Sequence, residues 1–129
     1  ASDVYKRQAQ KISDGGRIVF IGSGLGTRAI VPGIADYAGT KAAIAGYARG
    51  VQRDLGPRNI TVNVVQPGIM PTDMTGEVAE NFPQAVIDMH PIRRIATIEE
   101  VAGAVSYLVS PAASYTAGAV IDVSGGVLV

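Results

Sequence analysis

Two short apolar runs lie on either side of a stretch with helical periodicity, and this order limits the folds open to the chain. The first run spans residues 17–22, and the second, rich in β-branched residues, spans residues 60–65. Continuous apolar runs of this length are typical of strands buried on both faces. The stretch between them repeats apolar residues every three or four positions and meets the stop signal Gly56-Pro57, which predicts a helix. A strand, a helix and a second strand in this order predict a parallel sheet.

A second helix is predicted after residue 97. Thr97-Ile98-Glu99-Glu100 is a capping box, in which the first and last side chains satisfy each other's backbone amides. The helix is expected to end at Ser110-Pro111, because proline cannot continue it. The side chains that share its apolar face are Val101, Val105 and Leu108.

The rest of the chain adds a last strand and shorter elements. Residues 119–123 are predicted to form this strand, closed by Gly125-Gly126. Residues 9–14 are expected to end a helix, and three prolines within 69–95 predict short helical pieces there. We therefore expect an α/β fold, a partial doubly wound, Rossmann-like parallel sheet with helices on both faces.

Composition excludes several classes of function. The 129 residues are 47% hydrophobic, enough for one domain with a core. A formal net charge of zero argues against nucleic-acid and membrane-surface partners. The absence of cysteine excludes thiolate metal sites, and a single histidine, His90, excludes a multi-histidine site, so no metal is expected. No apolar run reaches the roughly 20 residues of a membrane span and no signal peptide is recognisable, so we expect a cytoplasmic protein.

Tyr37 and Lys41 lie one turn apart on the first predicted helix. A phenol with a pKa of about 10 exchanges protons poorly at neutral pH, and an ammonium one turn away favours the phenolate and lowers that pKa. The alternative is structural: a buried tyrosine bonded to backbone, and a lysine whose stem lies on apolar surface. Both residues belong to one helical stripe, which continues through Ile44, Ala48, Val51 and Leu55.

The glycine-rich loop after the first predicted strand is a weak match to a dinucleotide-binding turn. That turn requires Gly-x-Gly-x-x-Gly at the start of a helix. Here Gly22-Ser23-Gly24-Leu25-Gly26 is followed by Thr27 in place of the third glycine, and Pro32-Gly33 prevents a regular helix. We interpret the loop as a sheet edge that presents Ser23.

Four blocks, in the same order, resemble the short-chain dehydrogenase/reductase family. Residues 17–23 resemble the strand that presents a serine, and Tyr37-x-x-x-Lys41 follows fourteen residues after that serine. Residues 67–72, Pro-Gly-x-x-x-Thr, resemble the loop that holds a nicotinamide, and residues 118–126 resemble the terminal strand. The ketoacyl reductase and small-alcohol dehydrogenase branch is the most similar.

The resemblance implies roles for seven residues. Tyr37 would be the general acid and base, Lys41 would lower the pKa of Tyr37 and bind the nicotinamide ribose, and Ser23 would polarise the substrate carbonyl. Ser23 as an ordinary loop residue and Thr72 as a turn cap are the structural alternatives. The cofactor would be NAD or NADP, and the further residues implied to hold it are Pro67, Gly68, Met70 and Thr72.

Four other polar residues are interpreted without a catalytic role. Asn63 is expected to make structural hydrogen bonds, and His90 is expected at the surface. Arg93 and Arg94 are weak candidates for phosphate or carboxylate recognition, with a solvated face as the default. They lie in the stretch 73–95, which resembles the family's substrate lid.

The resemblance covers residues 9–129, the carboxy-terminal half of a protein family about twice as long. Residues 1–8 lack a clear period and are interpreted as a non-native junction. The expected function is the catalytic half of an NAD(P)-dependent oxidoreductase that interconverts an alcohol and a ketone, inactive as a fragment and a homo-oligomer (dimer or tetramer) at full length through residues 38–55 and the terminal strand. The alternative is an inactive truncated or degenerate non-enzymatic module that lacks the dinucleotide-binding half.

Overall fold

Three parallel strands form one sheet in the order β1-β2-β3. The computed structural model describes residues 2–73 and 83–128. The strands are β1 (Arg17–Ile21), β2 (Thr61–Pro67) and β3 (Val120–Val123). Pairing runs from Arg17–Thr61 to Ile21–Val65 between β1 and β2, and from Val64–Val120 to Pro67–Val123 between β2 and β3. The expected parallel sheet is confirmed.

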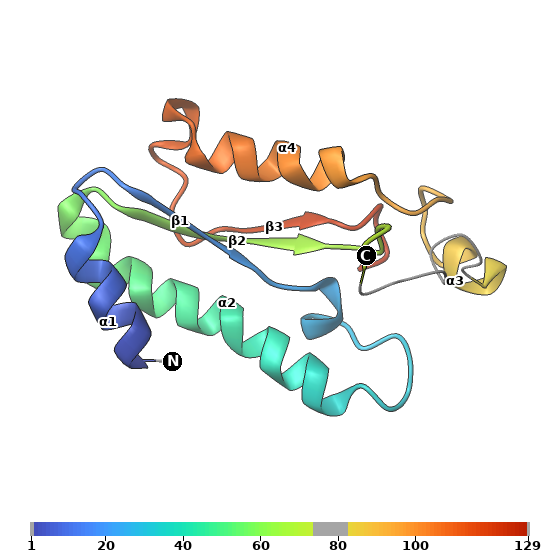
Figure 1. Cartoon of the computed structure of the whole chain (residues 1–129). Helices are drawn as coiled ribbons and strands as arrows, with labels where there is room; N and C mark the ends of the chain where they lie inside the picture. The colour runs from blue at the N-terminus through green and yellow to red at the C-terminus, as the bar shows by residue number, and fades with distance from the viewer. Residues whose placement is uncertain (1, 74–82, 129) are drawn as a thin grey trace.

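Helices cover both faces of this sheet, as expected (Figure 1). The α-helices α1 and α2 lie along one face, α4 lies along the other, and the short α3 stands beyond the carboxyl ends of the strands. The α-helices are α1 (Ser2–Lys11), α2 (Ala35–Leu55), α3 (Gln84–Asp88) and α4 (Ile98–Val109), and the 3-10 turns are η1 (Gly24–Gly26), η2 (Gly56–Arg58) and η4 (Pro111–Ala113).

The core forms because successive strand residues point to opposite faces. Val62 and Val64 of β2 pack against the α2 face, while Val65 packs against α4. Each helix packs against the sheet through the apolar residues that its period places on one side. The buried members on the helices are Ala48, Val51 and Leu55 of α2, and Val101 and Leu108 of α4.

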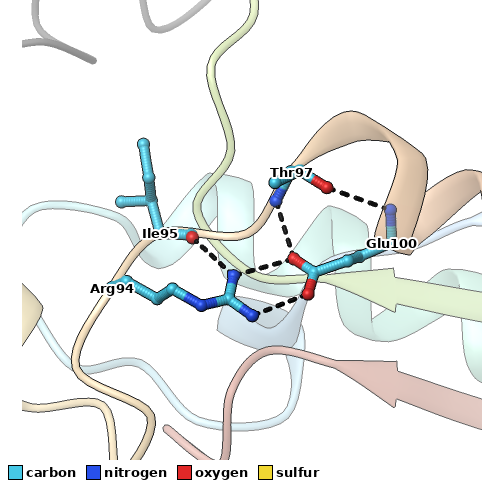
Figure 2. A network of polar contacts seen from close by, with 4 residues as sticks. All are labelled: Arg94, Ile95, Thr97 and Glu100. Carbon is cyan, nitrogen blue, oxygen red and sulfur yellow. Dashed lines mark hydrogen bonds and ion pairs between the residues drawn. The ribbon is translucent and has the colours of Figure 1, made fainter.

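Local signals set the ends of the two long helices. Gly56-Pro57 ends α2 at Leu55 as predicted. The capping box of α4 is present, since Glu100 N donates to Thr97 Oγ1 (3.3 Å) and Thr97 N donates to Glu100 Oε2 (2.8 Å) (Figure 2). Both predictions are confirmed.

The end of the amino-terminal helix is confirmed. It was expected within residues 9–14, and α1 ends at Lys11. The chain then turns at Gly15, whose φ of +76° favours glycine and whose amide donates to Arg58 O (2.9 Å). Residues 2–8 lie in the same helix, and their origin as a junction stays a prediction. Of the short pieces expected within 69–95, α3 is observed, and 74–82 lies outside the described residues.

A side-chain amide of α2 extends the backbone pairing of β2. Gln52 Nε2 donates to Ile60 O (3.1 Å), and Val62 N donates to Gln52 Oε1 (2.6 Å). These backbone groups precede the point at which β3 begins to pair with β2. Gln52 therefore fastens α2 to the sheet edge where a strand is lacking, which satisfies polar groups that would otherwise be buried alone.

Asn63 performs the structural role that the sequence predicted. Its side chain is fully buried, its Nδ2 donates to Thr116 O (2.8 Å), and its Oδ1 accepts from Ala119 N (3.0 Å). Both partners lie in the segment that leads into β3. Asn63 thus holds this segment beside β2.

None of the helices within 2–73 and 83–128 has the length and apolar character needed to cross a membrane.

Candidate functional site

The loops that follow the three strands meet at one edge of the sheet, because the strands are parallel. In open α/β sheets, ligands bind at the carboxyl ends of the strands. A cavity of about 410 Å³ opens at this edge. It is lined by all seven residues that the sequence singled out, namely Ser23, Tyr37, Lys41, Pro67, Gly68, Met70 and Thr72.

Ser23 is held directly after β1 as the N-cap of η1. Its side chain is buried, and its Oγ accepts a hydrogen bond from Leu25 N (3.3 Å). A hydroxyl that accepts in this way keeps its own hydrogen for donation. Ser23 can therefore act as a hydrogen-bond donor toward the cavity that it lines.

The turn that follows Ser23 packs directly on α2. A Cβ added to Gly26 would lie 2.7 Å from Ala42 N and 2.7 Å from the carbonyl carbon of Lys41. Real Cβ atoms do not approach backbone this closely, so only glycine lets η1 rest on the helix at this point. This contact sets the position of the Ser23 loop relative to Lys41.

Tyr37 and Lys41 occupy the first turns of α2, where the helix extends past the sheet. Tyr37 is 39% exposed and borders the cavity. Lys41 Nζ donates to Ile21 O (3.4 Å) at the end of β1 and lies 5.7 Å from the centroid of the Tyr37 ring. A cation at this distance is attracted by the ring face. The backbone carbonyl and the ring together place the ammonium beside the phenol.

The loop after β2 forms another wall of the cavity. Gly68 N donates to Val123 O (2.9 Å), and a Cβ on Gly68 would lie 2.8 Å from Ser124 Cα. The loop can approach the end of β3 only because residue 68 has no side chain. Met70 and Thr72 follow on the same wall.

The expectation for His90 was wrong. His90 is 3% exposed, and its Nδ1 makes a hydrogen bond with Val86 O (2.9 Å). Its burial depends on a distant contact, because Ile92 N donates to Gly125 O (3.1 Å) and brings the segment after α3 onto the terminal glycine turn. His90 lines both the site cavity and a neighbouring cavity of about 390 Å³.

Sequence reasoning also missed most of the apolar lining of the site cavity. Isolated apolar residues in loops have no period, so nothing in the sequence marks them as neighbours. They come from η1, from the stretch before α2, from the loop after β2, from α3 and from the carboxyl end of the chain. They are Leu25, Ile30, Val31, Ile69, Val86, Val127 and Leu128.

Arg93 and Arg94 are exposed, as the default interpretation expected. Arg94 donates to both carboxylate oxygens of Glu100, from Nη1 to Oε2 (2.8 Å) and from Nη2 to Oε1 (2.6 Å) (Figure 2). These hydrogen bonds, with that from Thr97 N, lower the pKa of Glu100 to about 2, and Glu100 raises the pKa of Arg94. Because Glu100 already occupies its guanidinium fork, Arg94 is a poor candidate for recognition of another anion.

In the part of the chain that the structure describes, no group of three or more His, Cys, Asp or Glu side chains is placed to hold a metal ion.

Comparison with known proteins gives consistent matches. Residues 2–128 match the family model described as enoyl-(acyl carrier protein) reductase. The 3-oxoacyl-[acyl-carrier-protein] reductase MabA of Mycobacterium tuberculosis is 47% identical over 111 residues, which are 86% of this chain and 44% of that protein. This chain spans about half the length of the curated relatives that it matches.

Solved structures agree with this result. A short-chain dehydrogenase/reductase from Serratia marcescens is 42% identical, with a TM-score of 0.89 over 96% of this chain and 50% of that chain. A short chain dehydrogenase from Burkholderia cenocepacia, solved in complex with NADP, is 37% identical, with a TM-score of 0.87 over 96% of this chain and 50% of that chain.

Proposed function

This chain belongs to the short-chain dehydrogenase/reductase family, and on that premise we propose that it is the catalytic half of an NAD(P)-dependent oxidoreductase that interconverts an alcohol and a ketone. The observation that carries the proposal is the convergence of seven sequence-predicted residues on one cavity. They come from separate segments of the chain, namely the loop after β1, the start of α2, and the end of β2 with the loop that follows it. Unrelated positions would not be expected to meet at the one edge where α/β sheets bind ligands.

The residues on the cavity walls fit the nicotinamide end of NAD or NADP. Lys41 supplies a cation for hydroxyl and phosphate-linked groups, and the loop after β2 offers Thr72 as a polar contact and Met70 as an apolar contact for a flat amide-bearing ring. Gly68 keeps this loop close to β3 and so leaves the cavity open. When bound, the nicotinamide supplies or accepts the hydride. Both NADP-bound and NADPH-bound structures occur among the similar proteins.

In the proposed mechanism, Ser23 and Tyr37 act on the substrate oxygen. Ser23 Oγ donates a hydrogen bond that strengthens as negative charge develops on that oxygen. Tyr37 Oη delivers a proton to the oxygen when the carbonyl is reduced, and removes it when the alcohol is oxidised. Lys41, held by Ile21 O beside the Tyr37 ring, stabilises the phenolate that forms when the proton leaves.

The lining also indicates the general character of the substrate. Among the described residues, the side chains around the cavity are apolar apart from Ser23, Tyr37, Lys41, Thr72 and His90. Such a lining gives little to a charged ligand, because burying a charge without a partner is costly. A small apolar ketone or secondary alcohol, with its oxygen toward Ser23 and Tyr37, suits these walls.

The decisive experiment is a chimera, in which residues 9–129 follow the amino-terminal part of the mycobacterial relative. We expect this chimera to oxidise NADPH or NADH in the presence of an apolar ketone, measured by nicotinamide absorbance. Tyr37→Phe should lower the rate by at least about 100-fold, because it removes the proton donor and little else.

Tyr47→Phe is the matched control for that variant. Tyr47 lies on the same helix and is 37% exposed, close to the value for Tyr37, but its ring packs on Phe20 rather than on the cavity. It should leave the rate unchanged. An inactive chimera that folds and binds the nicotinamide, or equal rates for both variants, would favour the alternative, a degenerate module without catalysis.

The assembly remains part of the proposal. We expect the full-length protein to be a dimer or tetramer through residues 38–55 and the terminal strand. Size-exclusion chromatography with light scattering on the chimera would test this expectation, and a monomer would contradict it.

A further inference from the structure

The buried imidazole of His90 has one nitrogen whose state is fixed by the fold. Its Nδ1 lies 2.9 Å from Val86 O. A carbonyl oxygen can only accept a hydrogen bond, so Nδ1 must carry the hydrogen. In the neutral ring, Nε2 therefore has no hydrogen and presents a lone pair.

That lone pair faces accessible space rather than protein. Two side-chain polar atoms of the described residues are fully buried without a hydrogen-bond partner, Arg17 Nε and Thr61 Oγ1. His90 Nε2 does not belong to this group. Among the described residues, the hydrogen-bond partner of the ring is Val86 O, which binds at Nδ1. His90 as a whole is 3% exposed, and the open space beside it is the pair of cavities that this residue lines.

The polar side chains of the cavity thus come from three parts of the chain. Ser23, Tyr37 and Lys41 come from the end of β1 and the start of α2, Thr72 comes from the loop after β2, and His90 comes from the segment after α3. The side chains that line the cavity with them are mainly apolar, for example Leu25, Ile69 and Val127. An acceptor in such surroundings is poorly solvated and gains much from a ligand that donates to it.

We propose that His90 is a specificity-determining residue, whose Nε2 accepts a hydrogen bond from a hydroxyl or amide N–H carried by an otherwise apolar ketone. The ligand class is therefore a ketone with a second, hydrogen-donating group. The position of the ketone oxygen rests on the proposed function of Ser23 and Tyr37, while the acceptor role of His90 rests on the geometry of the ring alone.

The first test is the tautomer of His90. Because the chain has one histidine, the ring nitrogens of a ¹⁵N-labelled sample give a single, unambiguous pair of signals. In mildly alkaline buffer, where imidazole is neutral, we expect Nδ1 to carry the proton and Nε2 to be unprotonated. The opposite tautomer would overturn the proposal.

The second test compares ligands matched in length. ω-Hydroxy-2-alkanones and the corresponding 2-alkanones are titrated into the chain, and binding is followed by the His90 ring signals and by isothermal calorimetry. For one chain length we expect the hydroxyketone to bind about tenfold more tightly, and the Nε2 signal to move on its binding. Equal affinities at every length, or no binding of either series, would overturn the proposal.

Variants separate this inference from the proposed function. His90→Leu should abolish the preference for the hydroxyketone, whereas His90→Gln, which keeps an acceptor, should retain part of it. A preference that survives in a folded His90→Leu variant, with its amide spectrum intact, would overturn the inference. Ser23→Ala should weaken both ligands alike, and a failure of that variant alone would contradict the role of Ser23 while the role of His90 stands.

Discussion

The layered body of the molecule and the carboxyl edge of its sheet are built by different means, although α2 belongs to both. In the body, the second half of α2 buries Ala48, Val51 and Leu55 against β2. At the edge, Tyr37 and Lys41 of the same helical stripe border a cavity. Residues of one helical stripe are thus buried in the core where a strand lies opposite, and they border a cavity where no strand does.

This difference shows where stability and chemistry reside. Burial of apolar side chains in regular layers stabilises the body. The edge is held mainly by close approaches of glycine backbone and by hydrogen bonds between loops, as at Gly26 and Gly68. Functional groups lie there because loops on a rigid scaffold can present side chains to a ligand.

The largest expected effect comes from the body. Leu55→Ala removes a buried side chain at the end of α2, and it should lower the free energy of unfolding by about 2–5 kcal/mol, measured by urea denaturation. Ile92→Ala, at the edge, should change it by less than about 1 kcal/mol, because Ile92 is 55% exposed. Similar losses for the two variants would remove the contrast between the regions.

A smaller effect is expected at the contact between the two regions. Gly26→Ala places a Cβ against the backbone of Lys41 and Ala42, so η1 must move away from α2 at a cost of about 1–3 kcal/mol. Amide chemical shifts should change around Ser23 and Lys41 and stay fixed in β3. A variant as stable as the wild type would show that the turn does not depend on this approach.

Gly103→Ala is expected to raise the free energy of unfolding, in contrast to the variants above. A Cβ at Gly103, in the middle of α4, meets nothing within 4 Å. Alanine should therefore stabilise the chain by about 0.5–1 kcal/mol through its higher helix propensity, a rise seen in the midpoint of thermal unfolding. Destabilisation would indicate that the outer face of α4 is packed in solution.

The smallest effect concerns the exposed ion pair at the start of α4. The folded-state pKa of Glu100 is lowered from 4.5 to about 2, chiefly by Arg94, so its contribution to stability is present above pH 4.5 and is lost as the pH falls toward 2. A carboxyl titration by NMR should give this low midpoint, and Arg94→Met should raise it. An unchanged midpoint in that variant would assign the shift to Thr97 alone.

Sequence alone predicted the features whose causes are local or periodic. The capping box of Thr97 and Glu100 needs four residues, and the α2 stripe needs one helical period. The convergence of Ser23 and Tyr37 followed from strand order together with a family resemblance. The burial of His90 could not be predicted, because it depends on a contact between Ile92 and Gly125, which are 33 residues apart in the chain.

The side-chain amide of Gln52 controls how fast the Val62 amide hydrogen exchanges with solvent. The Val62 amide hydrogen is bonded to Gln52 Oε1 rather than to a strand, so it can meet solvent deuterium only when that side chain withdraws. Gln52 belongs to the helix that presents Tyr37 and Lys41. The exchange rate of this one hydrogen therefore reports the openings in which Gln52 leaves β2, whether its side chain alone moves away or this part of α2 separates from the sheet.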